Sequence, residues 1–269
     1  MERRRPPAAV PLGLAALLAV AGVAMAACGP DRSDNVGATA TPGSGWSAPS
    51  AGSSGPSSTA PPAPTATSAP PPVPVQKRPA TVGGACASVK VIGARGTGES
   101  AGLGYLLSPV AKQIAAAVST PVTSIGLDYP ATADFVGSAQ QGTTELQRLI
   151  AAETSACLVL LGYSQGAMVV GDALAAVGAS GRKRIVAVVM FGDPRFNSAE
   201  PYNVGSYGKG SRGVYVRPSG QLSAFNSRIQ NYCNGGDPVC QGTGASGSGT
   251  HLDYHQYADD AARFVAGQF

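Results

Sequence analysis

Residues 158–167 read LVLLGYSQGA, and the fold class can be inferred from them. Four apolar residues are followed by a serine between two glycines, and then by residues with helical spacing. A G-x-S-x-G pattern between a buried strand and a helix is typical of a nucleophile elbow, a turn so tight that the serine is strained. The pattern predicts Ser164 as a nucleophile. It also predicts that the backbone N–H of Gln165, at the positive end of the helix, donates to a substrate oxyanion.

The remainder of the C-terminal part alternates between two kinds of segment. Residues 185–191 are apolar and largely β-branched without alternation, as expected for a strand buried on both faces. Alternating β and α units of this size predict an α/β fold with a mainly parallel sheet of about five strands, covered by helices on both faces. We expect strands at 89–94, 122–127, 158–161, 185–191 and 228–232, and helices at 105–118, 134–152, 164–177 and 257–266.

The N-terminal third has a different character. Residues 1–27 combine three arginines, an apolar core and small residues, which predicts a secretory signal peptide. Cys28 directly follows two alanines, an arrangement that resembles a lipoprotein cleavage site with a lipidated cysteine; ordinary secretion is the alternative. Residues 28–83 are rich in Pro, Ser, Ala and Thr and cannot bury enough apolar area to fold, so they predict a disordered tether. We therefore expect an extracellular protein, secreted or anchored to the membrane through Cys28.

Residues 84–269 are long enough for one domain with a good core. They contain 13 Lys and Arg residues against 12 Asp and Glu residues, so most of the formal charge of +4 belongs to the leader and tether. A nearly neutral domain without a basic stripe makes nucleic acid an improbable partner. We expect a monomeric catalytic domain.

The cysteines of this domain are Cys86, Cys157, Cys233 and Cys240, an even set that predicts disulfides in an exported protein. Three pairings are possible. The short loop between the last two favours a Cys233–Cys240 bridge, which leaves Cys86 for Cys157. Because the cysteine spacing lacks C-x-x-C pairs and the chain has only two histidines, we expect no metal and no cofactor.

A nucleophilic serine needs a general base, and the only histidines are His251 and His255. Both follow Ser164, as the order Ser, acid, His of the α/β-hydrolases requires. The acid must lie between Ser164 and the histidine. This leaves open four candidates: Asp172, Asp193, Glu200 and Asp237.

Two of these carboxylates are serious candidates. Asp193 follows an expected strand, whereas Asp237 lies inside the loop that a Cys233–Cys240 bridge would close. A triad acid must hold an imidazole in one tautomer and orientation, so a stapled loop favours Asp237.

Three segments together resemble the cutinase family of serine esterases. They are GYSQGA at 162–167, CNGGDPVC at 233–240 and HLDY at 251–254, and the resemblance extends over 86–269. It implies an α/β-hydrolase fold, a three-layer sandwich without a lid. It also implies Ser164 as nucleophile and, in the bridged loop, Asp237 as acid. The motif H-x-x-Y implies His251 as base, because only this histidine has a tyrosine three residues later.

The segment ARGTGE at 94–99 is similar to the end of the first strand in the same family. This similarity implies Thr97 as the second oxyanion-hole residue beside Gln165. The chain departs from the family at Cys157, which lies closer to the nucleophile than the usual cysteine does.

The resemblance implies an enzyme that hydrolyses short- to medium-chain esters of cutin, lipid or polyester type. Acetylxylan esterases share the motifs, so deacetylation of a polysaccharide is the nearest alternative. An inactive hydrolase scaffold that serves as a surface binding module is a third.

Overall fold

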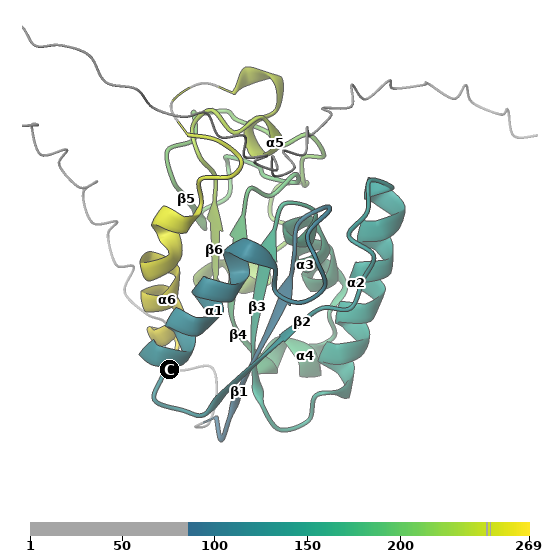
Figure 1. The fold of residues 1–269 in the computed structure, drawn as a ribbon, viewed down its shortest axis with the longest axis vertical. Coiled ribbons are helices and arrows are strands. Elements are labelled where there is room, and N and C mark those ends of the chain that lie inside the picture. Colours follow the sequence, from purple (N-terminus) through teal and green to yellow (C-terminus); the bar gives the residue numbers. More distant parts are fainter. Residues whose placement is uncertain (1–85, 246, 248) are drawn as a thin grey trace, which may run out of the picture. The chain divides into compact units, whose positions relative to one another are not determined.

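The computed structural model describes residues 86–245, 247 and 249–269 (Figure 1). The expected leader, Cys28 and tether lie outside these residues. The strands are β1 (Val89–Ala94), β2 (Val122–Gly126), β3 (Cys157–Tyr163), β4 (Ile185–Phe191), β5 (Asn203–Val204) and β6 (Ile229–Tyr232). The helices are α1 (Gly104–Ala117), α2 (Phe135–Ala152), α3 (Gln165–Ala176), α4 (Ala179–Arg184), α5 (Pro238–Gln241) and α6 (Ala258–Ala266).

The strands form one sheet in the order β2-β1-β3-β4-β6-β5, and every pairing between them is parallel. The α/β prediction is confirmed, but the sheet has six strands where the sequence predicted about five. The additional strand, β5, is only two residues long and lies at the edge of the sheet. It therefore has no apolar run from which the sequence could predict it. The short helix α4 was also not predicted.

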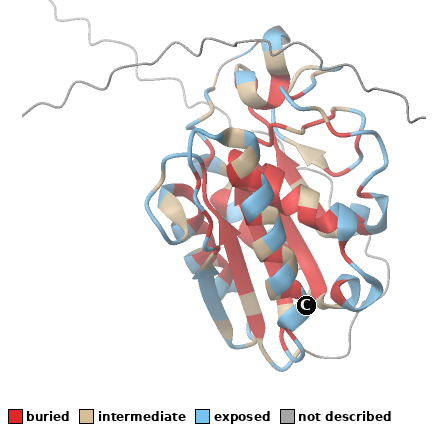
Figure 2. Ribbon diagram, turned by 90° about the vertical axis from the view of Figure 1, so that its right-hand side faces the viewer, coloured by how far each residue is buried: buried red, intermediate tan, exposed pale blue. Residues whose placement is uncertain are grey.

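Side chains alternate across the sheet, and this explains the unbroken apolar run of β3. Leu158 and Leu160 point into the core that α2 and α3 cover, whereas Val159 and Leu161 point into the core under α1 and α6. Figure 1 shows α1 and α6 together on one side of the sheet, and in Figure 2 the central strands are red, that is buried, between helices with pale blue outer faces, whereas the edge strand β2 has no buried residue. The fold is a three-layer sandwich.

The carboxyl ends of β3, β4 and β6 meet at one edge of the sheet. The chain continues from them into Ser164, Gly192 and Cys233 respectively. In open α/β sheets, ligands bind outside the carboxyl ends of the strands. This edge is therefore where a site is expected.

Two disulfides lie at different places in the domain. Cys86 is bonded to Cys157, whose position at the first residue of β3 puts this bridge at the end of the strand away from Ser164. Cys233 is bonded to Cys240 and closes the loop after β6. None of the helices among the described residues has the length and apolar character needed to cross a membrane.

Candidate active site

Ser164 stands at the turn between β3 and α3 with a φ of +56°, in the strained region that few non-glycine residues occupy. Both neighbouring glycines are required by close backbone contacts. A Cβ at Gly166 would lie 1.9 Å from the carbonyl oxygen of Ala94, and one at Gly162 would lie 2.6 Å from the carbonyl oxygen of Gly166. The turn therefore closes only with glycine at both positions, and it presents the serine hydroxyl at the edge of the sheet.

A chain of hydrogen bonds runs from Ser164 through His251 to Asp237. Nε2 of His251 lies 2.8 Å from Oγ of Ser164, and its Nδ1 lies 2.9 Å from Oδ2 of Asp237. The histidine side chain is partly exposed, whereas the carboxylate is fully buried. The structure thus brings together the three residues that the sequence proposed from three distant segments.

The surroundings of Asp237 keep its carboxyl ionised. Burial alone would raise the pKa of Asp237, but hydrogen bonds from His251, Tyr254 and the backbone N–H of Val239 outweigh it and hold that pKa below its usual value. An ionised carboxylate only accepts hydrogen bonds, so Nδ1 of His251 must carry the proton. Nε2 is then free to accept a proton from the serine hydroxyl.

Asn234 connects the loop that bears Asp237 with the segment that bears His251. Its side-chain amide donates to the carbonyl oxygens of Thr250 and Asp253, both at 3.1 Å. The backbone carbonyl oxygen of Asn234 accepts from Nε2 of Gln241 at 2.9 Å, across the loop that the Cys233–Cys240 bridge closes. With almost no exposed surface, Asn234 sets the separation of the two loops, a role that the sequence analysis missed.

The rival candidates are engaged elsewhere. The carboxylate of Asp193 accepts from the backbone N–H of Arg195 at 2.8 Å and from Nδ2 of Asn231 at 3.3 Å, and burial raises its pKa. His255 is exposed and packs beside Tyr105, with 5.2 Å between the ring centroids. Neither belongs to the hydrogen-bond chain at Ser164.

The two expected oxyanion-hole residues lie on different elements, Gln165 at the start of α3 and Thr97 in a turn after β1. The N–H of Gln165 opens α3, so it has no intrahelical acceptor. The side chain of Gln165 is fully buried and donates to the carbonyl oxygens of Thr132 and Phe135 at 3.0 and 3.1 Å. These hydrogen bonds fix the first residue of α2 and the loop before it. Thr97 lies in the exposed turn after β1.

Two charged residues that the sequence analysis quoted but gave no role hold the turn around Thr97. Arg95 is buried and donates to the carbonyl oxygens of Glu99 and Tyr129, both at 2.8 Å. The carboxylate of Glu99 accepts from the backbone N–H of Gly96 and, at 2.7 Å, from that of Tyr105. The acceptors of Arg95 come from several segments, so only the folded chain could reveal this clamp.

Tyr163 contacts His251 through both its ring and its hydroxyl. Its ring stacks on the His251 imidazole with 5.3 Å between centroids, and its hydroxyl donates to the carbonyl oxygen of His251 at 3.0 Å. The hydroxyl of Tyr105 donates in turn to that of Tyr163 at 3.1 Å. Tyr163, the first x residue of G-x-S-x-G, therefore orients His251.

Large apolar side chains are exposed beside His251 and at the start of α2. Leu252 follows His251 directly and is 62% exposed, and Val136, in the first turn of α2, is 55% exposed. Tyr215 stacks on Phe135, with 5.6 Å between centroids, so two segments meet next to the Gln165 side chain. The described residues contain no group of three or more metal-ligating side chains.

Comparison with known proteins places the chain in a family. Residues 85–269 match the family described as Cutinase. The chain belongs to the cutinase family. It is 33% identical to the cutinase of Kineococcus radiotolerans over 68% of this chain and 62% of that one. It is 30% identical to phospholipase Culp4 of Mycobacterium tuberculosis over 72% of this chain and 83% of that one.

A solved structure has a similar fold. The catalytic core domain of acetyl xylan esterase from Trichoderma reesei superposes with a TM-score of 0.58 and 27% identity, over 69% of this chain and all of that one. The fold is thus that of the α/β-hydrolases, as the sequence predicted. Like its cutinase relatives, the domain is a carboxylic-ester hydrolase.

Proposed function

We propose that residues 84–269 form a serine carboxylesterase in which Ser164 is the nucleophile, His251 the general base and Asp237 the acid. The observation that carries this proposal is the continuous chain of two hydrogen bonds, at 2.8 and 2.9 Å, that starts at the strained Ser164. A serine with a base in reach, and a base oriented by a third group, is the arrangement of an activated nucleophile.

The chemistry follows from the assigned protonation states. His251 takes the proton of the Ser164 hydroxyl as Oγ attacks the ester carbonyl, and Asp237 stabilises the resulting imidazolium. His251 then protonates the departing alcohol and leaves an acyl-serine. Water, activated by the same histidine, hydrolyses this acyl-enzyme and restores the serine.

The negative oxygen of each tetrahedral intermediate would lie at the start of α3. There the N–H of Gln165 donates to it, and Thr97 provides the second donor. The clamp of Arg95 and Glu99 around Thr97 supports this role, because preorganised donors stabilise a developing charge without reorganising. Removal of one donor costs about a hundredfold or more in kcat.

The nucleophile and base are tested by substitution. Ser164→Ala should abolish ester hydrolysis without unfolding the domain, and retained turnover would refute the assignment. His251→Ala should be far more damaging than His255→Ala, which removes an exposed imidazole nearby. Equal losses from the two histidine variants would contradict the choice of base.

The acid has its own matched control. Asp237→Asn should reduce kcat by several orders of magnitude, since it favours the wrong imidazole tautomer. Asp193→Asn should not, because Asp193 makes its hydrogen bonds to Arg195 and Asn231. A larger loss in Asp193→Asn than in Asp237→Asn would reverse the assignment.

The exposed apolar side chains beside His251 and at the start of α2 favour esters with an apolar acyl chain. Val136 and Leu252 would remain in contact with water unless a substrate covered them. We therefore propose short- to medium-chain esters, of lipid, cutin or polyester type, as the substrates.

Polysaccharide deacetylation is the second candidate, and the superposition on an acetyl xylan esterase favours it. Hydrolysis of p-nitrophenyl esters from acetate to palmitate by the full chain, beside Ser164→Ala, separates the two. A maximum at butyrate to octanoate supports the cutinase-like esterase, and activity confined to acetate supports deacetylation. Absence of activity at every length would leave the third reading, a surface binding module.

We further propose that the protein acts outside the cell, secreted or held at the membrane by a lipid on Cys28, with residues 28–83 as its tether. The two disulfides support an oxidising compartment. Intact-mass analysis of the protein from native membranes would detect the lipid. A mature N-terminus without added mass would indicate ordinary secretion.

A further inference from the structure

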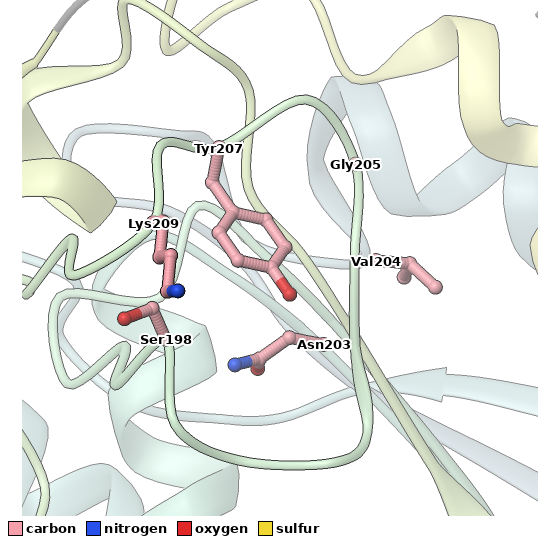
Figure 3. A pocket seen from close by; sticks show the side chains of 6 residues that line it. All are labelled: Ser198, Asn203, Val204, Gly205, Tyr207 and Lys209. Atoms are coloured by element: carbon pink, nitrogen blue, oxygen red, sulfur yellow. The ribbon is translucent and has the colours of Figure 1, made fainter.

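A pocket lies at the β5 edge of the sheet, outside the hydrogen-bond chain at Ser164. Its volume is about 460 Å³, within the range of small-ligand sites. The pocket is lined by Ser198, Asn203, Val204, Gly205, Tyr207 and Lys209 (Figure 3).

An aromatic ring forms one wall of this pocket. Figure 3 shows the ring of Tyr207 face-on, with its hydroxyl directed toward Asn203. The ring is held by an edge-to-face contact with buried Phe196, at 4.9 Å between centroids. Tyr207 is thus a fixed platform, and the negative face of its ring attracts the weakly positive C–H groups of a ligand.

Polar groups without protein partners surround this platform. Oδ1 of Asn203 is buried and receives no hydrogen bond from the described residues, although Nδ2 donates to the carbonyl oxygen of Asn197 at 2.7 Å. A buried acceptor of this kind calls for a donor. Within the described part of the chain, no carboxylate lies within ion-pair distance of Nζ of Lys209, and the hydroxyl of Ser198 makes no hydrogen bond.

We propose that this pocket binds an acidic sugar unit, with the sugar ring packed on Tyr207, its carboxylate on Lys209 and its hydroxyls on Ser198 and Asn203. An inorganic anion would leave the aromatic face unused, and an apolar ligand would leave the polar groups without partners. A sugar acid satisfies both. The site would hold the enzyme on an acidic polysaccharide, and it does not depend on the esterase proposal.

The pocket also contacts the loop that bears Asp237. Tyr207 packs on the cluster of Phe196 and the Cys233–Cys240 bridge, and the backbone N–H of Gly235 donates to Oγ of Ser206 at 2.8 Å. The ligand would thus bind beside, but not in, the catalytic machinery.

Calorimetric titration of the full chain carrying Ser164→Ala with a galacturonate trisaccharide tests the proposal. The neutral galactose trisaccharide is the control ligand. We expect the acidic sugar to bind and the neutral one to bind at least tenfold more weakly. We also expect Lys209→Ala to weaken the binding of the acidic sugar by about tenfold, as the loss of a charge-assisted contact implies. Lys112→Ala, which removes an exposed lysine from α1, should leave it unchanged.

Tyr207→Phe keeps the platform and should retain most of the affinity, whereas Tyr207→Ala should abolish it. In the background with Ser164 intact, hydrolysis of a small soluble ester by Lys209→Ala should equal that of the unmodified chain. No binding at millimolar sugar would overturn the proposal, as would equal affinity for the neutral sugar. Equal losses in Lys209→Ala and Lys112→Ala would also overturn it, because they would indicate a general charge effect.

Discussion

Tyr254 donates its hydroxyl to Oδ2 of Asp237 at 2.5 Å, the same oxygen that receives Nδ1–H of His251. The hydroxyl also accepts from the backbone N–H of Asn234 at 3.1 Å. Burial, together with the neighbouring carboxylate, raises the pKa of Tyr254, so the phenol remains a donor. The carboxylate of Asp237, the proposed acid, is thus held from two directions, by the histidine and by the tyrosine.

Tyr254→Phe should lower kcat by about tenfold. A hydrogen bond to a buried charge contributes about 1.5–3 kcal/mol, and the hydrogen bond from His251 to Asp237 remains and limits the loss. Steady-state kinetics on a p-nitrophenyl ester measure this effect. Tyr257→Phe is the matched control, since its hydroxyl donates to Oδ1 of Asn234 and not to the acid. Equal kcat values in the two variants would contradict a role for Tyr254 through Asp237.

The two disulfides should separate stability from activity. Cys86→Ser with Cys157→Ser opens a loop of 71 residues and should lower the free energy of unfolding by about 4 kcal/mol, with kcat nearly unchanged at a permissive temperature. Cys233→Ser with Cys240→Ser opens a loop of 7 residues, costs about 2 kcal/mol, and should lower kcat because the loop carries Asp237. Thermal unfolding and kinetics on both double variants provide the test; a larger loss of kcat in the first would disagree with it.

Glu153 should contribute an acid-sensitive part of the stability. Hydrogen bonds from the backbone N–H groups of Ala156 and Ser155 and from the Lys90 ammonium hold the pKa of Glu153 well below its usual value. A carboxyl with a lowered folded-state pKa stabilises the protein above its unfolded pKa of about 4.3, and this contribution is lost as pH falls through the folded value.

Glu153→Gln should therefore lower Tm at pH 7, and the difference from the unmodified chain should shrink as pH falls below about 4. Glu145→Gln is the control, because Glu145 pairs with Arg148 on the surface and should change Tm little at any pH. A Tm difference for Glu153→Gln that stays constant between pH 7 and pH 3 would rule out this linkage.

The stacked pair of Tyr215 and Phe135 should influence the acyl chain that the site accepts. The pair joins the start of α2 to the segment around Tyr215. The N–H of Tyr215 in turn donates to the carbonyl oxygen of Pro194 at 2.8 Å. Tyr215→Ala removes one ring and should raise kcat/KM for longer p-nitrophenyl esters relative to butyrate. Tyr215→Phe keeps the stack and should retain the original profile. An unchanged profile in Tyr215→Ala would show that the pair does not limit the chain.

Local sequence determined the fold class and pointed to Ser164 as the proposed nucleophile. The run before Ser164 is apolar at every position because β3 is buried on both faces, and the two glycines have close backbone neighbours that exclude any side chain. The short spacing of Cys233 and Cys240 favoured their bridge, and the presence of only two histidines limited the choice of base. Each of these signals lies within a few residues of chain.

Tertiary structure decided what depends on contacts between distant segments. It brought Asp237 rather than Asp193 to His251, because the two loops are joined through Asn234. It also produced the two-residue strand β5 and the clamp of Arg95 on carbonyl oxygens about 30 residues away, neither of which leaves a periodic pattern. Hydrogen bonds between loops depend on the packed arrangement of the whole sheet, and the sequence around either partner alone does not encode them.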